Sequence, residues 1–120
     1  MIRKTALALA FTVALAAPAV AADLAGKYTY NGTESDGTKY DEAGSLVIVQ
    51  EKSGAYNITW DGGEYVGVGQ VTGNVFAVAS VAEKKNTIML MEIAPDGSLS
   101  GKWWRRNDAG AKGTEVWKKN

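Results

Sequence analysis

The sequence predicts an all-β fold, a small antiparallel up-and-down β-barrel of about eight strands. Three observations lead to this prediction. After residue 22 the chain is a series of short segments in which apolar and polar residues alternate, as in strands with one buried face. Glycine-centred turns separate these segments, and no stretch repeats apolar residues at helical spacing. The chain also has no cysteine and no histidine, so disulfides cannot stabilise it.

Residues 1–22 have the features of a signal peptide. A basic start precedes an apolar run, Thr5–Ala17, that is shorter than a bilayer-spanning helix. The small residues of Ala19–Ala22 then suit a signal peptidase. We therefore expect cleavage after this segment, export to the periplasm or out of the cell, and no membrane anchor in the mature protein. The remaining residues, 23–120, have the length of one domain.

Removal of this leader leaves eleven basic and thirteen acidic residues, a net charge of about −2. This balance argues against nucleic acid as a partner, because phosphate backbones are bound through clustered positive charge. The absence of histidine and cysteine also removes the usual catalytic bases and the usual zinc, copper or haem ligands. The acidic run Glu34, Asp36, Asp41 and Glu42 lacks the spacing of a calcium-binding loop. We expect no enzymatic activity, no metal and no cofactor.

Two strands are expected at the start of the domain. The first, Gly26–Thr33, directs Tyr28 and Tyr30 inward, and the second, Leu46–Glu51, is apolar on both faces. Between them, Glu34–Gly44 is the longest connection in the domain. Long connections over a rigid scaffold commonly carry function, so we expect a mobile flap over one mouth of the barrel.

Short turns determine the register of the middle strands. One turn lies at Gly62-Gly63 and the next at Gly73-Asn74. A two-residue hairpin at the first turn places Trp60 opposite Tyr65. Extending both registers puts large side chains on one inner face, with glycines opposite some of them. The predicted inner face consists of Tyr56, Ile58, Trp60, Tyr65, Gly67, Gly69, Val71, Phe76, Val78 and Ser80.

The following hairpin turns at Pro95-Asp96-Gly97, which suits a type I turn followed by a left-handed glycine. Its register places Ile93 opposite Leu99 and Met89 opposite Trp103. The large residues of this hairpin therefore face the same interior as those of the preceding strands.

The last strand has one favoured pairing, in which it begins after Gly113. This pairing places Trp117 near Trp103 on the inner face. It also places Glu115 near Arg105. We therefore expect an ion pair between these two side chains at one end of the barrel.

Five short motifs resemble those of small exported bacterial proteins whose function is not settled. The motifs are Gly26-Lys27-Tyr28, Tyr56–Trp60, Gly67-Val68-Gly69, Asp96–Trp103 and Gly113-Thr114-Glu115. More distantly, the same meander resembles calycin-type barrels, including avidins and lipocalins, and periplasmic barrel inhibitors of proteases and lysozymes. The inhibitor families usually contain cysteines, which this chain lacks. The resemblance implies the fold and implies no site residue, because the shared motifs are turns and strands.

The predicted interior allows two arrangements. In the favoured one, side chains fill the barrel, because eight-stranded barrels are only just wide enough to hold them. In the alternative, Gly67, Gly69 and Gly101 open a shallow cup, in which aromatic rings hold an apolar guest and Arg105 fixes its anionic or polar end. The residues expected to form this ligand site are Trp60, Ser80, Trp103, Arg105 and Glu115.

The outer wall offers a second candidate site. Trp104 and Arg106 alternate with inward-facing residues and therefore point outward. An outward tryptophan near Leu90 is typical of a partner-binding surface. The alternative is an apolar strip covered by lysine and arginine stems.

These sites lead to three hypotheses of function. We expect an exported, non-enzymatic binding or interaction module whose partner is another secreted protein or a host protein. The first alternative is a carrier of a small apolar or amphipathic ligand inside the barrel. The second alternative is an inhibitor of a secreted hydrolase. The sequence leaves the oligomeric state open.

Overall fold

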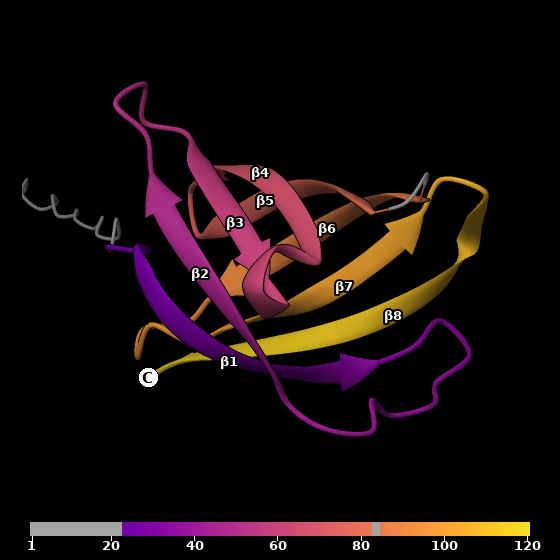
Figure 1. Ribbon diagram of the computed structural model, residues 1–120. Helices are drawn as coiled ribbons and strands as arrows, with labels where there is room; N and C mark the ends of the chain where they lie inside the picture. The colour runs from indigo at the N-terminus through magenta and orange to yellow at the C-terminus, as the bar shows by residue number, and fades with distance from the viewer. Residues whose placement is uncertain (1–22, 83–84) are drawn as a thin grey trace, which may run out of the picture.

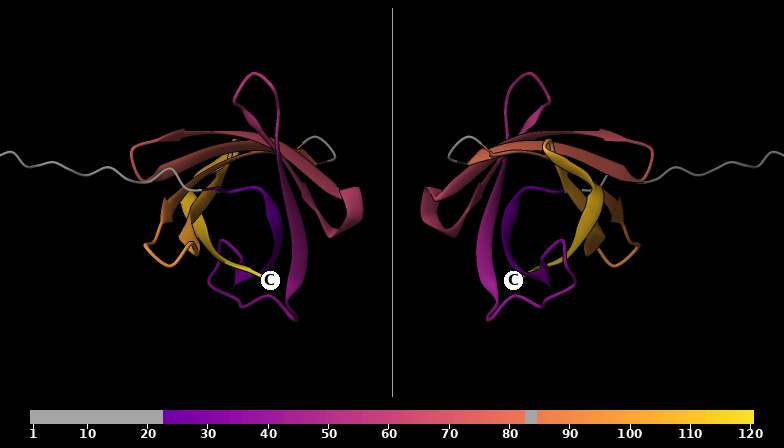
Figure 2. Two further views of the ribbon diagram at one scale, coloured as in Figure 1. Left: turned by 90° about the vertical axis from the view of Figure 1, so that its left-hand side faces the viewer. Right: turned by 90° about the vertical axis from the view of Figure 1, so that its right-hand side faces the viewer.

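The computed structural model describes residues 23–82 and 85–120, and the expected signal peptide lies outside the described residues. The strands are β1 (Gly26–Thr33), β2 (Gly44–Gln50), β3 (Tyr56–Trp60), β4 (Tyr65–Thr72), β5 (Val75–Ala82), β6 (Lys85–Ile93), β7 (Leu99–Arg105) and β8 (Asp108–Lys119). These eight antiparallel strands follow chain order around one closed barrel (Figures 1 and 2). β1 closes it by pairing with β8. The predicted fold class is confirmed.

Three of the hairpins have the predicted register. Trp60 faces Tyr65 across β3 and β4, and Met89 faces Trp103 across β6 and β7. The β4–β5 hairpin has the two-residue turn expected at Gly73-Asn74. Short connections fix register because they leave the flanking strands little freedom to slide.

The β3–β4 connection is longer than the two-residue turn predicted from its glycines. It spans residues 61–64 and contains a 3-10 turn, η2 (Asp61–Gly63). Gly62 and Gly63 have φ of 74° and 111°, in the region that favours glycine, and Asp61 has φ of 51°. The turn places Asp61 at one end of the barrel. No helix in the described residues is long and apolar enough to span a membrane.

The predicted pairing of the last two strands is wrong. β8 begins at Asp108 rather than after Gly113, because the chain reverses directly after β7. Trp103 therefore faces Gly113, where a Cβ atom would overlap its indole ring. The glycine lets this ring lie against the backbone of the wall. Trp117 faces Leu99 instead, and both tryptophans are buried, as predicted.

Side chains fill the half of the barrel that contains the start of β1 and the end of β8, at the left of Figure 1, which we call the filled half. Trp117 lies at its centre and makes T-shaped ring contacts with Tyr28 and Phe76, at centroid distances of 6.5 Å and 6.2 Å. Leu24, only 2% exposed, covers this end, and its carbonyl accepts a 2.8 Å hydrogen bond from the Tyr28 hydroxyl. The buried apolar residues of the barrel are Leu24, Tyr28, Leu46, Ile48, Tyr56, Ile58, Trp60, Phe76, Val78, Met89, Met91, Leu99, Trp103 and Trp117.

Candidate functional site

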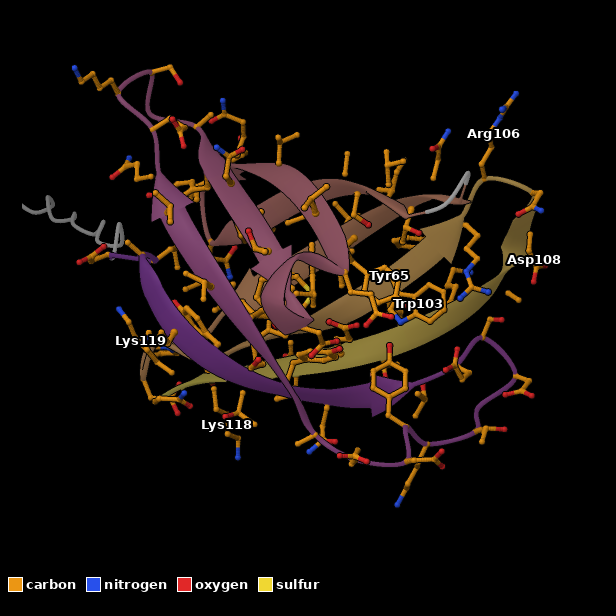
Figure 3. All side chains as sticks on the ribbon, in the orientation of Figure 1. Tyr65, Trp103, Arg106, Asp108, Lys118 and Lys119 are labelled. Carbon is orange, nitrogen blue, oxygen red and sulfur yellow. The ribbon has the colours of Figure 1, made fainter. Side chains whose placement is uncertain are left out.

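The other half of the barrel, which we call the open half, contains a pocket of about 310 Å³. The expectation of an interior filled by side chains is therefore wrong here. All five residues predicted as a ligand site line this pocket, and they are Trp60, Ser80, Trp103, Arg105 and Glu115. Alternation along the strands brings them together, because each belongs to the inward-facing set of its strand. Figure 3 labels Tyr65 and Trp103 in this region, and Lys118 and Lys119 near the opposite end.

The segment between β1 and β2, residues 34–43, covers one side of the pocket. Lys39 forms a β-bridge with Thr33, and the Tyr40 backbone N–H donates a 2.9 Å hydrogen bond to the Gly32 carbonyl. The Tyr40 ring makes a T-shaped contact with Tyr30 at 6.1 Å. These contacts place Tyr40 on the pocket wall. The segment therefore lies over the mouth of the barrel, as expected for the flap, except that its last residue, 44, belongs to β2. The mobility of the flap stays a prediction.

Glu115 forms the floor of the pocket and is only 8% exposed. Its Oε1 accepts a 2.7 Å hydrogen bond from Trp117 Nε1, and its Oε2 accepts a 2.9 Å bond from the Tyr40 hydroxyl. Burial raises the pKa of Glu115, and these hydrogen bonds act in the opposite direction. The carboxyl group therefore connects the centre of the filled half to the wall of the open half.

A second carboxylate, Asp61, is held in the same way. Its Oδ2 accepts a 2.5 Å hydrogen bond from the Tyr30 hydroxyl, and its Oδ1 accepts a 3.1 Å bond from the Ser45 backbone N–H. Burial, together with the hydrogen bond to Asp61, raises the pKa of Tyr30. Burial also raises the pKa of Tyr40, beside Glu115. Both tyrosines therefore stay protonated donors at neutral pH.

The predicted ion pair between Arg105 and Glu115 is wrong. In the described part of the chain, Arg105 Nη2 lies 4.0 Å from Oε1 of Glu34 instead. The earlier start of β8 explains the difference, because Arg105 faces Asp108 across the strands while Glu115 lies further along β8. The Arg105 guanidinium also lies over the Trp103 ring, 5.0 Å from its centroid. Arg105 thus lies at the rim of the pocket, with its guanidinium group packed over an aromatic ring.

Trp103 has one unusual feature. The residue is only 4% exposed, and its indole N–H makes no hydrogen bond to any described residue. The Tyr40 hydroxyl is near enough for this N–H to lower the Tyr40 pKa, although the two groups lack hydrogen-bond geometry. A buried donor without an acceptor costs free energy, so this group marks a position where an acceptor atom would be stabilised.

Sequence reasoning missed several lining residues, most of them in the connections rather than the strands. They are Tyr30, Glu34, Tyr40, Asp41, Glu42, Asp61, Glu64, Tyr65, Thr87 and Met89. One signal was present: Tyr40 is the only aromatic residue in an otherwise polar, acidic connection. Such a residue is commonly buried against the mouth that its connection covers.

The predicted outer residues lie outside the barrel. Trp104 is partly exposed and faces Ile88 in the neighbouring strand, and Lys112 Nζ lies 5.9 Å from its ring centroid. Arg106 is exposed at the β7–β8 turn, where Figure 3 labels it, and its backbone N–H donates a 2.9 Å bond to the Asn86 carbonyl. A partner at this surface stays a prediction.

Within the described ranges, no group of three or more His, Cys, Asp or Glu side chains is placed to hold a metal ion. In the acidic connection, Asp36 accepts a hydrogen bond from the Thr38 backbone N–H within its own turn. Comparison with protein-family models and with curated proteins gives no match for this chain. The geometry of the pocket is therefore the basis for the functional proposal.

Proposed function

We propose that this protein is an exported, non-enzymatic binding protein that holds a small amphipathic molecule in the open half of its barrel. The observation that carries the proposal is the pocket of about 310 Å³. Ligand pockets have volumes of roughly 300–1,000 Å³ and combine apolar or aromatic walls with a few polar groups. The leader-like features of residues 1–22 support export. The resemblance to calycin-type carriers supports the same use of a barrel interior, as an analogy of fold.

The size of the pocket limits the guest. One water molecule occupies about 30 Å³ in the liquid, so the pocket has room for about ten such volumes. A guest with about ten non-hydrogen atoms fits this space. The pocket is therefore suited to a small metabolite.

The polar groups of the pocket favour binding over catalysis. Both oxygens of Glu115 and both oxygens of Asp61 accept hydrogen bonds from the protein itself. Groups held in this way are positioned to orient a guest. No histidine in the chain offers an alternative base.

A ligand screen tests the proposal. Purified protein is titrated with a panel of small neutral, cationic and anionic molecules, and tryptophan fluorescence and the thermal midpoint are measured. Binding of at least one class raises the midpoint, because a ligand that binds only the folded state stabilises it. Trp103→Ala abolishes this response, and Trp104→Ala, on the outer wall, preserves it. A panel with no binder, or a response that survives Trp103→Ala, contradicts the proposal.

An exposed apolar row on the outer wall supports a second candidate function, the binding of a secreted or host protein. Val68, Ala79, Ile88 and Trp104 lie in register across β4, β5, β6 and β7. Val68 is 56% exposed and Ile88 58% exposed. Exposed apolar rows of this kind are typical of interaction surfaces, including those of enzyme inhibitors. If this surface binds a protein, Ile88→Ser combined with Trp104→Ala abolishes its capture and leaves ligand binding in the pocket unchanged.

A further inference from the structure

The lining of the pocket carries an excess of negative charge. Among the described residues that form it, Arg105 is the single basic side chain, and its guanidinium lies at the rim beside Glu34. The acidic residues of the lining are Glu34, Asp41, Glu42, Asp61, Glu64 and Glu115. Glu115 is buried, and the other five are exposed around the mouth of the pocket. Negative charge gathered around a concave site raises the local concentration of cations. The pocket therefore favours positive charge.

Two of these carboxylates are fixed in position by uncharged donors. Tyr30 and the Ser45 backbone hold Asp61, and Tyr40 and Trp117 hold Glu115. Hydrogen bonds from neutral groups orient a carboxylate without supplying a compensating positive charge. A cationic guest would therefore meet carboxyl groups that are already in place, which reduces the entropic cost of binding.

Aromatic rings form much of the remaining wall. Trp60, Trp103, Tyr30, Tyr40 and Tyr65 all line the pocket. The faces of such rings attract ammonium and guanidinium groups. The protein already shows this contact once, because the Arg105 guanidinium lies 5.0 Å from the centroid of the Trp103 ring.

An independent feature points to a second group on the guest. The Trp103 side chain lines the same pocket, and its indole N–H is buried and has no hydrogen-bond partner among the described residues. An N–H group of this kind is a donor only. A guest that presents an oxygen acceptor to it removes the cost of leaving the donor unpaired.

We propose that the pocket selects a small organic cation, an alkylammonium compound that also carries an oxygen acceptor. This inference rests on the proposed function of the pocket. The ammonium group lies among the aromatic rings and the carboxylates of Asp61 and Glu64, and the oxygen accepts a hydrogen bond from Trp103 Nε1. It replaces the expectation that Arg105 binds an anionic group of the guest, because Arg105 lies at the rim beside Glu34.

The test uses three probes of one size and shape. Acetylcholine supplies a quaternary ammonium group and an ester carbonyl. Its neutral carbon isostere, 3,3-dimethylbutyl acetate, has a tert-butyl group in place of the trimethylammonium group. The third probe, 5,5-dimethylhexanoate, ends in the same tert-butyl group and carries a negatively charged carboxylate. Titration calorimetry at low salt measures each affinity. The cation binds about tenfold more tightly than the neutral isostere, as a desolvated cation–π contact supported by carboxylates predicts. The carboxylate binds most weakly.

The outcomes separate this inference from the proposed function. Equal affinity for the cation and the neutral isostere, or a preference for the carboxylate, overturns the selection of cations while the pocket remains a ligand site. The absence of binding by all three probes, and by the wider panel described above, overturns both.

Two variants test the named contacts. Trp103→Phe keeps an aromatic ring and removes the N–H, so affinity for acetylcholine falls about fivefold while affinity for ethyltrimethylammonium, which has no acceptor, is nearly unchanged. Glu64→Gln reduces the preference for the cation over its isostere. Glu92→Gln, the matched control in β6, removes the same charge from an exposed residue outside the pocket lining and leaves that preference unchanged. Equal effects of Glu64→Gln and Glu92→Gln would show that net charge, and not the pocket, attracts the cation.

Discussion

The two halves of this barrel follow one alternation of inward and outward residues and yet have different interiors. In the filled half, Trp117 and Phe76 extend across the centre, and Leu24 covers the end. In the open half, the Trp103 ring lies against the backbone at Gly113, along the wall. Large side chains therefore do not by themselves fill a barrel. Whether the interior is filled depends on where each ring packs. A ring that contacts another ring at the centre fills the barrel, whereas a ring that lies against a glycine of the neighbouring strand leaves space.

The halves also differ in the polarity of their inward residues. The filled half is stabilised by burial of apolar and aromatic groups, which contributes about 25 cal/mol for each Å² removed from water. The open half directs Ser80, Thr87 and Glu115 into the pocket. Each such group loses hydration on folding and needs a partner. We therefore expect the open half to contribute less to stability than the filled half, a difference that mutations can measure.

The largest expected effect is the difference between two buried tryptophans. Trp117→Ala removes the central ring of the filled half and lowers the free energy of unfolding by about 3–5 kcal/mol, as large cavities in well-filled cores do. Trp103→Ala lowers it by less, because one side of this residue already borders the pocket. Urea denaturation measures both values. Equal losses would contradict the difference between the halves.

A smaller effect is expected from a glycine of the open half. Gly113→Ala introduces a Cβ atom that overlaps the Trp103 ring, so the ring must shift at a cost of about 1–3 kcal/mol. Gly110→Ala is the matched control in the same strand, because a Cβ atom there meets nothing within 4 Å. Denaturation and intrinsic tryptophan fluorescence, to which Trp103 contributes, measure the two variants. If both behave alike, the ring does not lie over Gly113.

Glu115→Gln tests the floor of the pocket through the pH dependence of stability. Burial raises the pKa of Glu115 above its ordinary value of 4.5, so the folded protein binds this proton more tightly than the unfolded chain. Its contribution to stability is full below pH 4.5 and declines as pH rises through the folded-state pKa. Glu115→Gln lacks a titrating group at this position and therefore lacks this decline. At pH 7 we expect its thermal midpoint to equal or exceed that of the unmutated protein. A variant that loses stability more steeply over this window would contradict the raised pKa.

The smallest effect is expected at the rim. Arg105→Gln removes a half-exposed ion pair with Glu34 whose atoms are 4.0 Å apart, and such pairs contribute about 0–1 kcal/mol. The thermal midpoint therefore changes little, and cation affinity in the pocket rises because the variant lacks the basic side chain that lines the pocket in the described part of the chain. A large loss of stability would show that Arg105 holds the open half together.

The sequence predicts the fold and much of the register, and particular residues explain where it fails. Turns with glycine or proline at Gly73-Asn74 and Pro95–Gly97 identify their own hairpins. The reversal before β8 occurs at Arg106-Asn107, which contains neither residue type, so the sequence pattern predicts a strand that begins only after Gly113. Because the predicted register of the last strand is wrong, the ion pair predicted between Glu115 and Arg105 is wrong as well.

The candidate site was predictable to the extent that it lies on strands. Alternation alone places Trp60, Trp103 and Glu115 on one inner face, whatever their exact neighbours. Tyr40 and Asp61 come from connections, whose conformations depend on contacts such as the bond from the Tyr30 hydroxyl to Asp61. The acidic character of the pocket was missed because most of its charge comes from these connections.

A crystal structure of residues 23–120 that shows ordered solvent tests the difference between the halves most directly. We predict a water or small molecule in the open half that accepts a hydrogen bond from Trp103 Nε1, and no solvent between Trp117 and Phe76. A structure in which side chains of residues 34–43 fill the pocket, with the Trp103 N–H bonded to one of them, would contradict it.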